Sequence, residues 1–309
     1  MFINQNIKAY LCTFFSVLMW GITFISTKIL LRDFSPIEIL FSRFLLGFAL
    51  LLIIYRKNNR IHTKKEEILF ALTGLSGITL YYLFENIALN YSLASNVGIL
   101  VAIGPLFTGI FASVFLKEKL KINFFIGFIF AIIGIFVIAF NGKFILKINP
   151  IGDMFAVLAA VMWGIYSVLV KKIADLGYNS VLITKKTFMY GIIFMLPAML
   201  FMGFDVNMND YLKPINLINL LFLSFIACTL CFITWAYSIK ILGAVKTNTY
   251  IYFIPIITLI ASKIILDENI TVFAVIGIVF ILLGVIISQA NISFKKMNKI
   301  NTKKIINNK

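Results

Sequence analysis

Two charged side chains lie inside stretches of this sequence that are otherwise almost wholly apolar. Counted as helix, Arg43 stands about six residues, or roughly 9 Å, from the end of its stretch, and Glu85 about four residues, or roughly 6 Å, from the end of the next. A charge at the centre of a bilayer costs on the order of 2.5 to 3.5 kcal/mol, so such a side chain faces a partner or a water-filled cavity. The similar depths make an Arg43–Glu85 ion pair geometrically possible. Glu85 is otherwise suited to bind a proton or a cationic group, whereas Arg43 has the alternative of extending to the membrane interface.

Polar residues at helical spacing accompany Glu85. Tyr82, Glu85 and Asn86 fall at i, i+3 and i+4, which places them on one helical face. Towards the other end of the chain, Asn248 and Tyr252 share a face at i and i+4. We expect the two faces to line a route for a solute.

Three tryptophans and two prolines also lie well inside apolar stretches. Trp20, Trp163 and Trp235 suit an aromatic cavity wall or cation–π contacts with an amine, and they suit close helix packing equally well. Pro105 and Pro255 each remove a backbone hydrogen bond, which predicts a bend that frees carbonyl groups. Such bends serve a gate or a carbonyl site, or packing alone.

The elements that must position these residues follow from the composition. Of the 309 residues, 61% are hydrophobic and 13% are charged, and the mean hydropathy is +1.01. These values predict a membrane protein rather than a soluble domain. The sequence Ser35-Pro36-Ile37-Glu38 predicts a capped helix start. Apolar runs long enough to cross about 30 Å of hydrocarbon as helices occur ten times, at residues 9–31, 37–55, 68–89, 93–116, 122–141, 152–172, 181–203, 216–238, 243–266 and 271–290.

The order of residues in these runs is written twice. Met19-Trp20-Gly21-Ile22 recurs at residues 162–165, an offset of 143. Further along, the offset is 150, and Ala94, Pro105, Leu116, Glu118, Gly127 and Gly134 match Ala244, Pro255, Leu266, Glu268, Gly277 and Gly284. Seven extra residues within 204–214 explain the change of offset. We therefore predict two five-helix repeats at residues 8–141 and 152–290, followed by a basic cytoplasmic tail at residues 291–309.

The net charge of +16 is distributed unevenly along the chain. The loops and tails on one side of the ten runs hold 21 Lys and Arg residues, and those on the other side hold 5. By the positive-inside rule, this bias predicts that both termini are cytoplasmic. Because each repeat has five helices, the second crosses the membrane in the opposite sense, which predicts an inverted repeat. Nucleic-acid binding is not expected, since membrane topology accounts for the charge.

Enzyme chemistry finds no support in the sequence. The single histidine, His62, lies in a charged loop, which leaves no paired-histidine metal site. Cys228 and Cys231 form a CxxC inside an apolar run without a second pair, so helix packing is favoured over zinc or redox chemistry. A Walker phosphate-binding loop is not found. We expect no catalytic residue, no metal and no cofactor.

Several duplicated features resemble one family. The paired Trp-Gly helices, Pro105 with Pro255, and the segments at residues 116–120 and 266–270 are similar to those of the EamA-type branch of the drug/metabolite transporter superfamily. The resemblance extends over about residues 8–290. It implies an all-α membrane protein of ten helices in two inverted repeats, often an exporter of amino acids or other small metabolites.

The expected function is therefore that of a secondary active transporter in the bacterial inner membrane. It would move a small metabolite, amino acid or drug-like solute by alternating access, in the export direction. The expected partners are the solute, the lipid bilayer and a proton or other coupling ion, whereas the sequence does not set the oligomeric state. A passive channel and a non-transporting sensor with the same fold are the alternatives.

Overall fold

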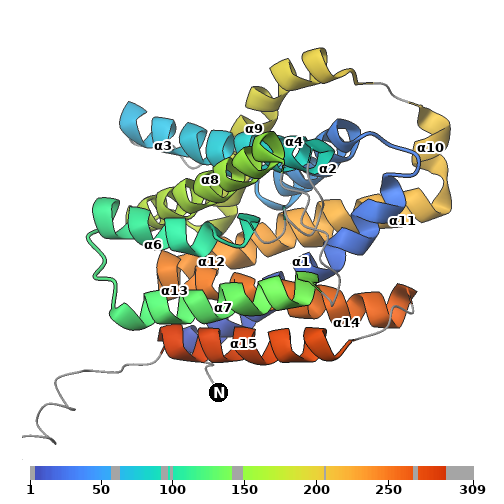
Figure 1. Cartoon of the computed structure of the whole chain (residues 1–309). Coiled ribbons are helices and arrows are strands. Elements are labelled where there is room, and N and C mark those ends of the chain that lie inside the picture. The colour runs from blue at the N-terminus through green and yellow to red at the C-terminus, as the bar shows by residue number, and fades with distance from the viewer. Residues whose placement is uncertain are drawn as a thin grey trace, which may run out of the picture.

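The computed structural model describes residues 4–56, 63–91, 97, 100–140, 149–204, 207–266 and 271–289. Within these ranges the chain forms a bundle of helices (Figure 1). His62, part of the predicted fourth run and the predicted tail at 291–309 lie outside the described residues. The helical segments are α1 (Gln5–Leu30), α2 (Pro36–Ile54), α3 (Lys64–Gly74), η1 (Leu75–Leu80), α4 (Tyr81–Tyr91), α6 (Gly104–Phe115), α7 (Ile122–Phe140), α8 (Pro150–Asp175), α9 (Ser180–Met202), α10 (Met208–Leu212), α11 (Pro214–Leu221), η2 (Phe222–Leu230), α12 (Cys231–Leu242), α13 (Ala244–Asn248), η3 (Thr249–Phe253), α14 (Ile254–Leu266) and α15 (Val272–Gln289).

Eight helices in the described part of the chain are long and apolar enough to cross a membrane. Three of them are composite, since α3 continues through η1, α11 through η2 into α12, and α13 through η3 into α14. Two shorter apolar helices, Gly104–Phe115 and Ile122–Ile138, occupy the positions of the predicted fourth and fifth runs. The prediction of an all-helical membrane protein is confirmed, and eight of the ten predicted runs meet the length and hydropathy of a crossing.

The predicted helix start at Ser35 is confirmed in detail. The backbone N–H of Ser35 donates to Glu38 Oε2 at 2.6 Å, and the N–H of Glu38 donates to Ser35 Oγ at 3.4 Å. Pro36 is the first residue of α2, where its missing N–H removes no helical hydrogen bond. This capping box fixes where α2 begins and therefore how deep Arg43 lies.

Two π-helical segments interrupt long helices at equivalent places. The offset of 150 carries residues 75–80 of η1 onto 225–230, which lie inside η2. The hydroxyl of Thr79 in η1 donates to Gly191 O in α9 at 2.9 Å, and that of Thr229 in η2 donates to Gly47 O in α2 at 3.3 Å. Each wide turn is thus tied to a helix of the other half of the chain.

Close contacts between the halves also occur in exchanged pairs. A Cβ on Gly21 of α1 would lie 2.7 Å from Ile257 Cβ of α14, and one on Gly164 of α8 would lie 2.9 Å from Phe107 Cβ of α6. The offset of 143 relates the two glycines, and the offset of 150 relates Phe107 to Ile257. Each half therefore presents to the other the same contact that it receives.

The same exchange governs the pairing of α7 with α15, which lie side by side at one edge of the bundle (Figure 1). A Cβ on Gly134 would lie 2.5 Å from Gly277 O, and a Cβ on Gly277 would lie 2.5 Å from Gly134 O. Gly127 and Gly284 meet in the same way about two helical turns from the first pair. Small residues of this kind let membrane helices approach until their backbones touch.

Replacing Gly134 with valine is expected to destabilise the protein. The added side chain has no room against the α15 backbone, and overpacking of this kind costs about 1 to 3 kcal/mol. The measurement is the thermal unfolding midpoint of the purified protein in detergent. The matched control is Val275→Leu, which adds a methylene at a side chain of α15 that is 52% exposed. Equal midpoints for the two variants would contradict this account of the α7–α15 contact.

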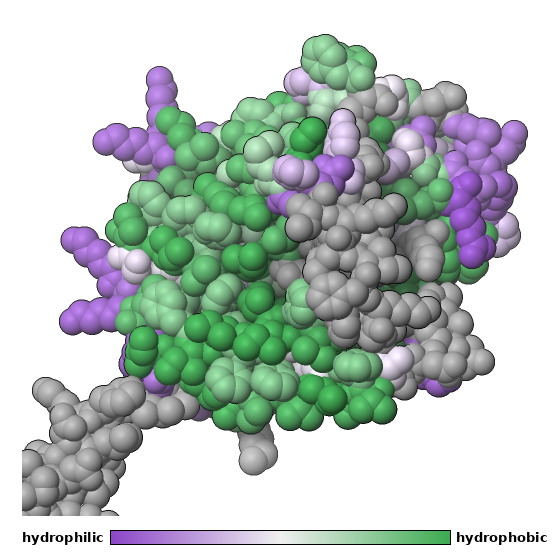
Figure 2. Space-filling model, in the orientation of Figure 1, coloured by the Kyte–Doolittle hydropathy of each residue, from purple (hydrophilic) through white to green (hydrophobic). Residues whose placement is uncertain are grey.

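The surface agrees with a membrane environment. One face is covered mainly by hydrophobic side chains, and hydrophilic side chains gather at its two opposite edges (Figure 2). Large apolar residues exposed on α7 and α15 include Ile129, Phe136, Val279 and Ile286. An apolar belt between polar ends is the surface expected of a protein whose solvent is lipid.

Candidate functional site

All three tryptophans of the chain meet in the interior of the bundle. Trp20 comes from α1, Trp163 from α8 and Trp235 from α12. The Trp20 ring centroid lies 5.7 Å from that of Trp163 and 4.9 Å from that of Trp235, and the last two are 6.3 Å apart. Trp20 and Trp163 are the duplicated pair in the sequence, so equivalent side chains of the two halves face each other here. We call these three residues the tryptophan cluster.

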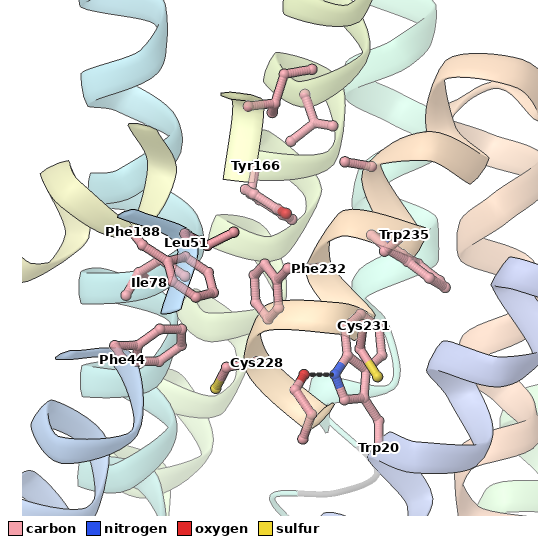
Figure 3. Close-up of a cluster of buried hydrophobic side chains, with 14 of the residues drawn as sticks. Trp20, Phe44, Leu51, Ile78, Tyr166, Phe188, Cys228, Cys231, Phe232 and Trp235 are labelled. Atoms are coloured by element: carbon pink, nitrogen blue, oxygen red, sulfur yellow. Dashed lines mark hydrogen bonds between the residues drawn. The ribbon is translucent and has the colours of Figure 1, made fainter. Parts of the chain in front are cut away.

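Further rings extend the tryptophan cluster towards α2 and α9. Phe232 of α12 lies between Trp20 and Phe188, with centroid distances of 5.8 Å and 5.3 Å (Figure 3). Phe44 of α2 packs edge-on against Phe188 at 5.0 Å. Every one of these side chains is less than a tenth exposed. The interior between the halves is therefore an aromatic enclosure.

Arg43 brings a positive charge to the edge of this enclosure. Its Nε donates to Cys228 Sγ at 3.0 Å, and its Nη2 donates to the Tyr82 hydroxyl at 2.9 Å. The guanidinium also lies over the rings of Tyr82, at 4.7 Å, and Phe44, at 5.1 Å. Only 8% of the residue is exposed. A buried cation is thus held by a phenol, a thiol and two aromatic faces.

Glu85 lies on the same helix as Tyr82, but it does not pair directly with Arg43. No ion pair within 4.0 Å joins Arg43 to a carboxylate of the described residues, so the ion pair that the similar depths allow is not a direct contact. The two charges nevertheless attract each other across the larger separation. The nearest polar contact of Glu85 is with the Tyr81 hydroxyl, which donates to Oε1 at 3.4 Å. The Tyr82 hydroxyl accepts from Arg43 and the Tyr81 hydroxyl donates to Glu85, so each charged group has a phenol as its partner. Glu85 remains only half-buried.

Asn248 of α13 is hydrogen-bonded to Trp163 of the tryptophan cluster. Its Oδ1 accepts hydrogen bonds from Trp163 Nε1 at 2.8 Å and from Ser167 Oγ at 3.3 Å, and its Nδ2 donates to Ala244 O at 2.9 Å. The side chain is fully buried. Asn248 therefore fixes the orientation of Trp163.

Tyr252 does not share the face of Asn248, contrary to the prediction from spacing. Residues Thr249–Phe253 form a 3-10 helix, which turns about 120° per residue instead of 100° and so moves a side chain four positions along to another face. Tyr252 packs instead with Ala131, Ile135 and Ile281 of α7 and α15. Its hydroxyl is buried without a hydrogen-bond partner.

The two prolines each stand at the start of a new helical segment. Pro105 is the second residue of α6, after a turn at residues 102–103, and Pro255 is the second residue of α14, after the 3-10 helix. Proline suits the first turn of a helix because the N–H groups there have no helical acceptor.

Asn86 lies on α4 one residue after Glu85 and is half-buried.

Three residues that contact the site are not among those singled out from the sequence. Tyr81 stands at i−4 from Glu85, so helical spacing alone could have identified it. Cys228 was assigned to packing because its CxxC suggested only redox or zinc chemistry, and its contact with Arg43 depends on tertiary structure. Ser167 carries no local signal. Among the described residues, three or more His, Cys, Asp or Glu side chains do not gather at any point where a metal ion could bind.

Replacing Asn248 with leucine is expected to leave Trp163 Nε1 buried without an acceptor. A buried unsatisfied donor costs about 1 to 3 kcal/mol, so the unfolding midpoint should fall and tryptophan emission should shift. The control is Asn219→Leu, because the amide of Asn219 donates only to Ile215 O of its own helix. If both variants unfold and emit alike, the Asn248–Trp163 hydrogen bond has no such role.

Polar networks close the bundle at both ends of α2. At its start, Lys213 Nζ pairs with Asp33 at 2.9 Å and with Asp210 at 2.8 Å, and Asn216 donates to Asp33 at 2.7 Å. The hydrogen bonds from Asn216 and Lys213 lower the pKa of Asp33. We call these four residues the Lys213 network. It joins the α1–α2 connection to the segment of α10 and α11.

At the other end of α2, a second network joins the start of α3 to α8 and α9. The Tyr178 hydroxyl donates to Glu66 Oε2 at 2.6 Å, and Lys186 Nζ pairs with Glu67 at 2.7 Å. Asn179 Nδ2 donates to the Tyr55 hydroxyl at 2.7 Å. We call these residues the Glu66–Glu67 network. Both networks connect one half of the chain to the other.

Comparisons with known proteins agree with this architecture. The EamA-like transporter family matches the chain twice, over residues 7–140 and 150–289. A solved crystal structure covers 91% of this chain and 97% of its own, with a TM-score of 0.75 and 17% sequence identity, and so shows the same fold.

Relatives of similar length carry names of the same kind. An uncharacterized transporter of Archaeoglobus fulgidus is 28% identical over 93% of this chain and 99% of its own length. One of Clostridium kluyveri is 29% identical over 97% of both chains, and YyaM of Bacillus subtilis, also an uncharacterized transporter, is 27% identical over 95% of this chain and 97% of its own. The chain belongs to the EamA-like transporter family and is a multi-pass membrane transporter.

Proposed function

We propose that this protein is a secondary active transporter that works by alternating access. It is built from ten transmembrane helices in two inverted five-helix repeats, at residues 8–141 and 152–290, with both termini in the cytoplasm of a bacterial cell. The exchanged contacts of Gly21 and Gly164, and those between α7 and α15, support this symmetry. The charge bias of the sequence supports the orientation.

The observation that carries the proposal is that both halves of the chain contribute side chains to the tryptophan cluster. Trp20 comes from the first half, and Trp163 and Trp235 come from the second. Phe44 and Phe232 connect Arg43 to these rings, and Tyr81 connects Glu85 to Trp163. A site at the interface of two pseudo-symmetric halves can be exposed to either side by rocking one half against the other. We place the solute there, with Tyr82, Asn86 and Asn248 as further contacts.

The two end networks supply the closures that alternating access requires. The Lys213 network and the Glu66–Glu67 network lie at opposite ends of α2, and each bridges the halves. Opening one while keeping the other would expose the interior to one side at a time. The breaks before Pro105 and Pro255 give the two halves equivalent points of flexure.

Glu85 is the residue we propose to couple transport to a proton. It is the described carboxylate nearest the tryptophan cluster along α4, it has no ion-pair partner within 4.0 Å, and it is half-buried. The proposed cargo is a small metabolite, amino acid or drug-like solute, moved outward. A passive channel is the competing assignment, and it would need a continuous polar helix face.

The test is counterflow in proteoliposomes. Solutes that leave cells more quickly when the protein is produced would first be identified by an efflux screen of cells loaded with metabolite mixtures. We expect liposomes preloaded with such a solute to accumulate its radiolabelled form transiently, with a saturable rate. Linear, non-saturable flux with ionic conductance would assign the protein to channels, and absence of any flux would favour a sensor.

A further inference from the structure

The charge of Arg43 is incompletely matched by the protein. Two of its three guanidinium nitrogens have partners, Cys228 Sγ and the Tyr82 hydroxyl, and neither partner is a carboxylate. Nη1 makes no hydrogen bond with any residue in the described ranges. A guanidinium stays protonated in proteins, so Arg43 cannot become neutral to relieve the mismatch.

Burial makes the missing counter-charge of Arg43 energetically unfavourable. Removing a cation from water is unfavourable unless an anion replaces the lost solvation, and Arg43 is only 8% exposed. Glu85 belongs to the same region but lies beyond 4.0 Å and accepts from Tyr81 instead. The two charges attract each other across this separation, but no carboxylate of the described residues hydrogen-bonds to Nη1. Nη1 can therefore still donate to an anionic group of a solute.

The surroundings define the rest of the ligand. The Phe44 ring lies beside the guanidinium, and Phe232 packs between Phe44 and Trp20 of the tryptophan cluster. Such rings suit a hydrocarbon or aromatic body, and the planar fork of a guanidinium suits a carboxylate. A cationic group at this place would meet the positive charge of Arg43 at short range.

We propose that Arg43 is the specificity-determining residue of the solute site, and that it selects solutes in which an anionic oxygen group, such as a carboxylate, is attached to an apolar body. This inference rests on the proposed function, because it places the solute at the tryptophan cluster. Tyr82 positions the guanidinium by accepting from Nη2, and Cys228 does so by accepting from Nε.

The location of the tryptophans gives a direct readout of binding. Because all three tryptophans of the chain lie in the cluster, emission excited selectively from tryptophan reports on this site and not on the tyrosines elsewhere. The purified full-length protein in detergent would be titrated with three matched triplets of acid, alcohol and amine that have methyl, isobutyl and 2-phenylethyl bodies. The acids of this panel are acetate, 3-methylbutanoate and 3-phenylpropionate.

We expect the acid of at least one triplet to bind about tenfold or more tightly than its alcohol and amine, as a charge-assisted bidentate contact allows. Arg43→Gln should remove this preference while the alcohol still binds, and Arg43→Lys should retain part of it because the charge remains. The control is Arg56→Gln, at an exposed position outside the site, which should leave the preference unchanged. Alcohol binding shows that each variant is folded.

The results separate the inference from the proposed function. Equal responses to acid, alcohol and amine in every triplet, including no response at all, would overturn the inference, as would an acid preference that survives Arg43→Gln. An acid preference without counterflow would leave the inference standing and overturn transport. Saturable counterflow of cationic or neutral solutes only would leave transport standing and overturn the inference about Arg43.

Discussion

Glu85→Gln is expected to abolish coupled solute flux while leaving membrane expression intact. Glutamine keeps the size of the side chain and its ability to accept from Tyr81, but it can neither carry a charge nor exchange a proton. Loss of a charge-assisted interaction worth about 3 kcal/mol corresponds to a reduction of about 100-fold. The measurement is proton-driven uptake or efflux in inverted membrane vesicles, with the protein quantified in the same membranes.

The control for this prediction is Glu38→Gln. This substitution makes the same chemical change at the start of α2. The Glu38 side chain accepts from Ser35 N there, and a glutamine oxygen can accept the same hydrogen bond. Flux in this variant should remain near that of the natural sequence. Unimpaired flux in Glu85→Gln would remove Glu85 from the mechanism.

Lys213→Met is expected to open the bundle at the start of α2 and expose Cys228. Lys213 links Asp33 and Asp210, so its loss removes two ion pairs and leaves two carboxylates facing each other without a counter-charge. Because these ion pairs are partly exposed, their loss shifts the equilibrium only modestly towards the open form. Cys228 is fully buried and contacts Arg43, so it reacts only when the interior opens.

The labelling rate of Cys228 measures this opening. In a background with Cys12→Ser and Cys231→Ser, Cys228 is the single thiol of the chain. A charged methanethiosulfonate reagent should modify it about two- to fivefold faster in Lys213→Met. Lys171→Met is the control, because the ion pair of Lys171 is with Asp175 on its own helix. The same rate in all three proteins would exclude the Lys213 network as a closure.

Features that depend only on neighbouring residues could be predicted from the sequence. The capping box of Ser35 and Glu38 and the apolar length of the long helices are properties of short segments, and the structure has them. Duplication of Trp20 at Trp163 indicated that the two helices are equivalent. That their rings lie 5.7 Å apart required the packing of both halves.

The errors came from features that only tertiary structure determines. Comparable depths made an Arg43–Glu85 pair possible, but the phenol of Tyr82 occupies the contact with Arg43. Uniform helical spacing put Tyr252 beside Asn248, whereas a 3-10 segment before Pro255 turns it towards α7 and α15. Cys228 had no sequence signal because its partner is 185 positions away.

The central claim is that solute binds at the tryptophan cluster during transport, and protection of Cys228 tests it most directly. In the single-thiol variant, a solute that undergoes counterflow should slow labelling of Cys228. The solute concentration that halves the labelling rate should equal the concentration that gives half-maximal counterflow. Saturable counterflow with no protection of Cys228 at any concentration would contradict the claim and place the transport route elsewhere in the protein.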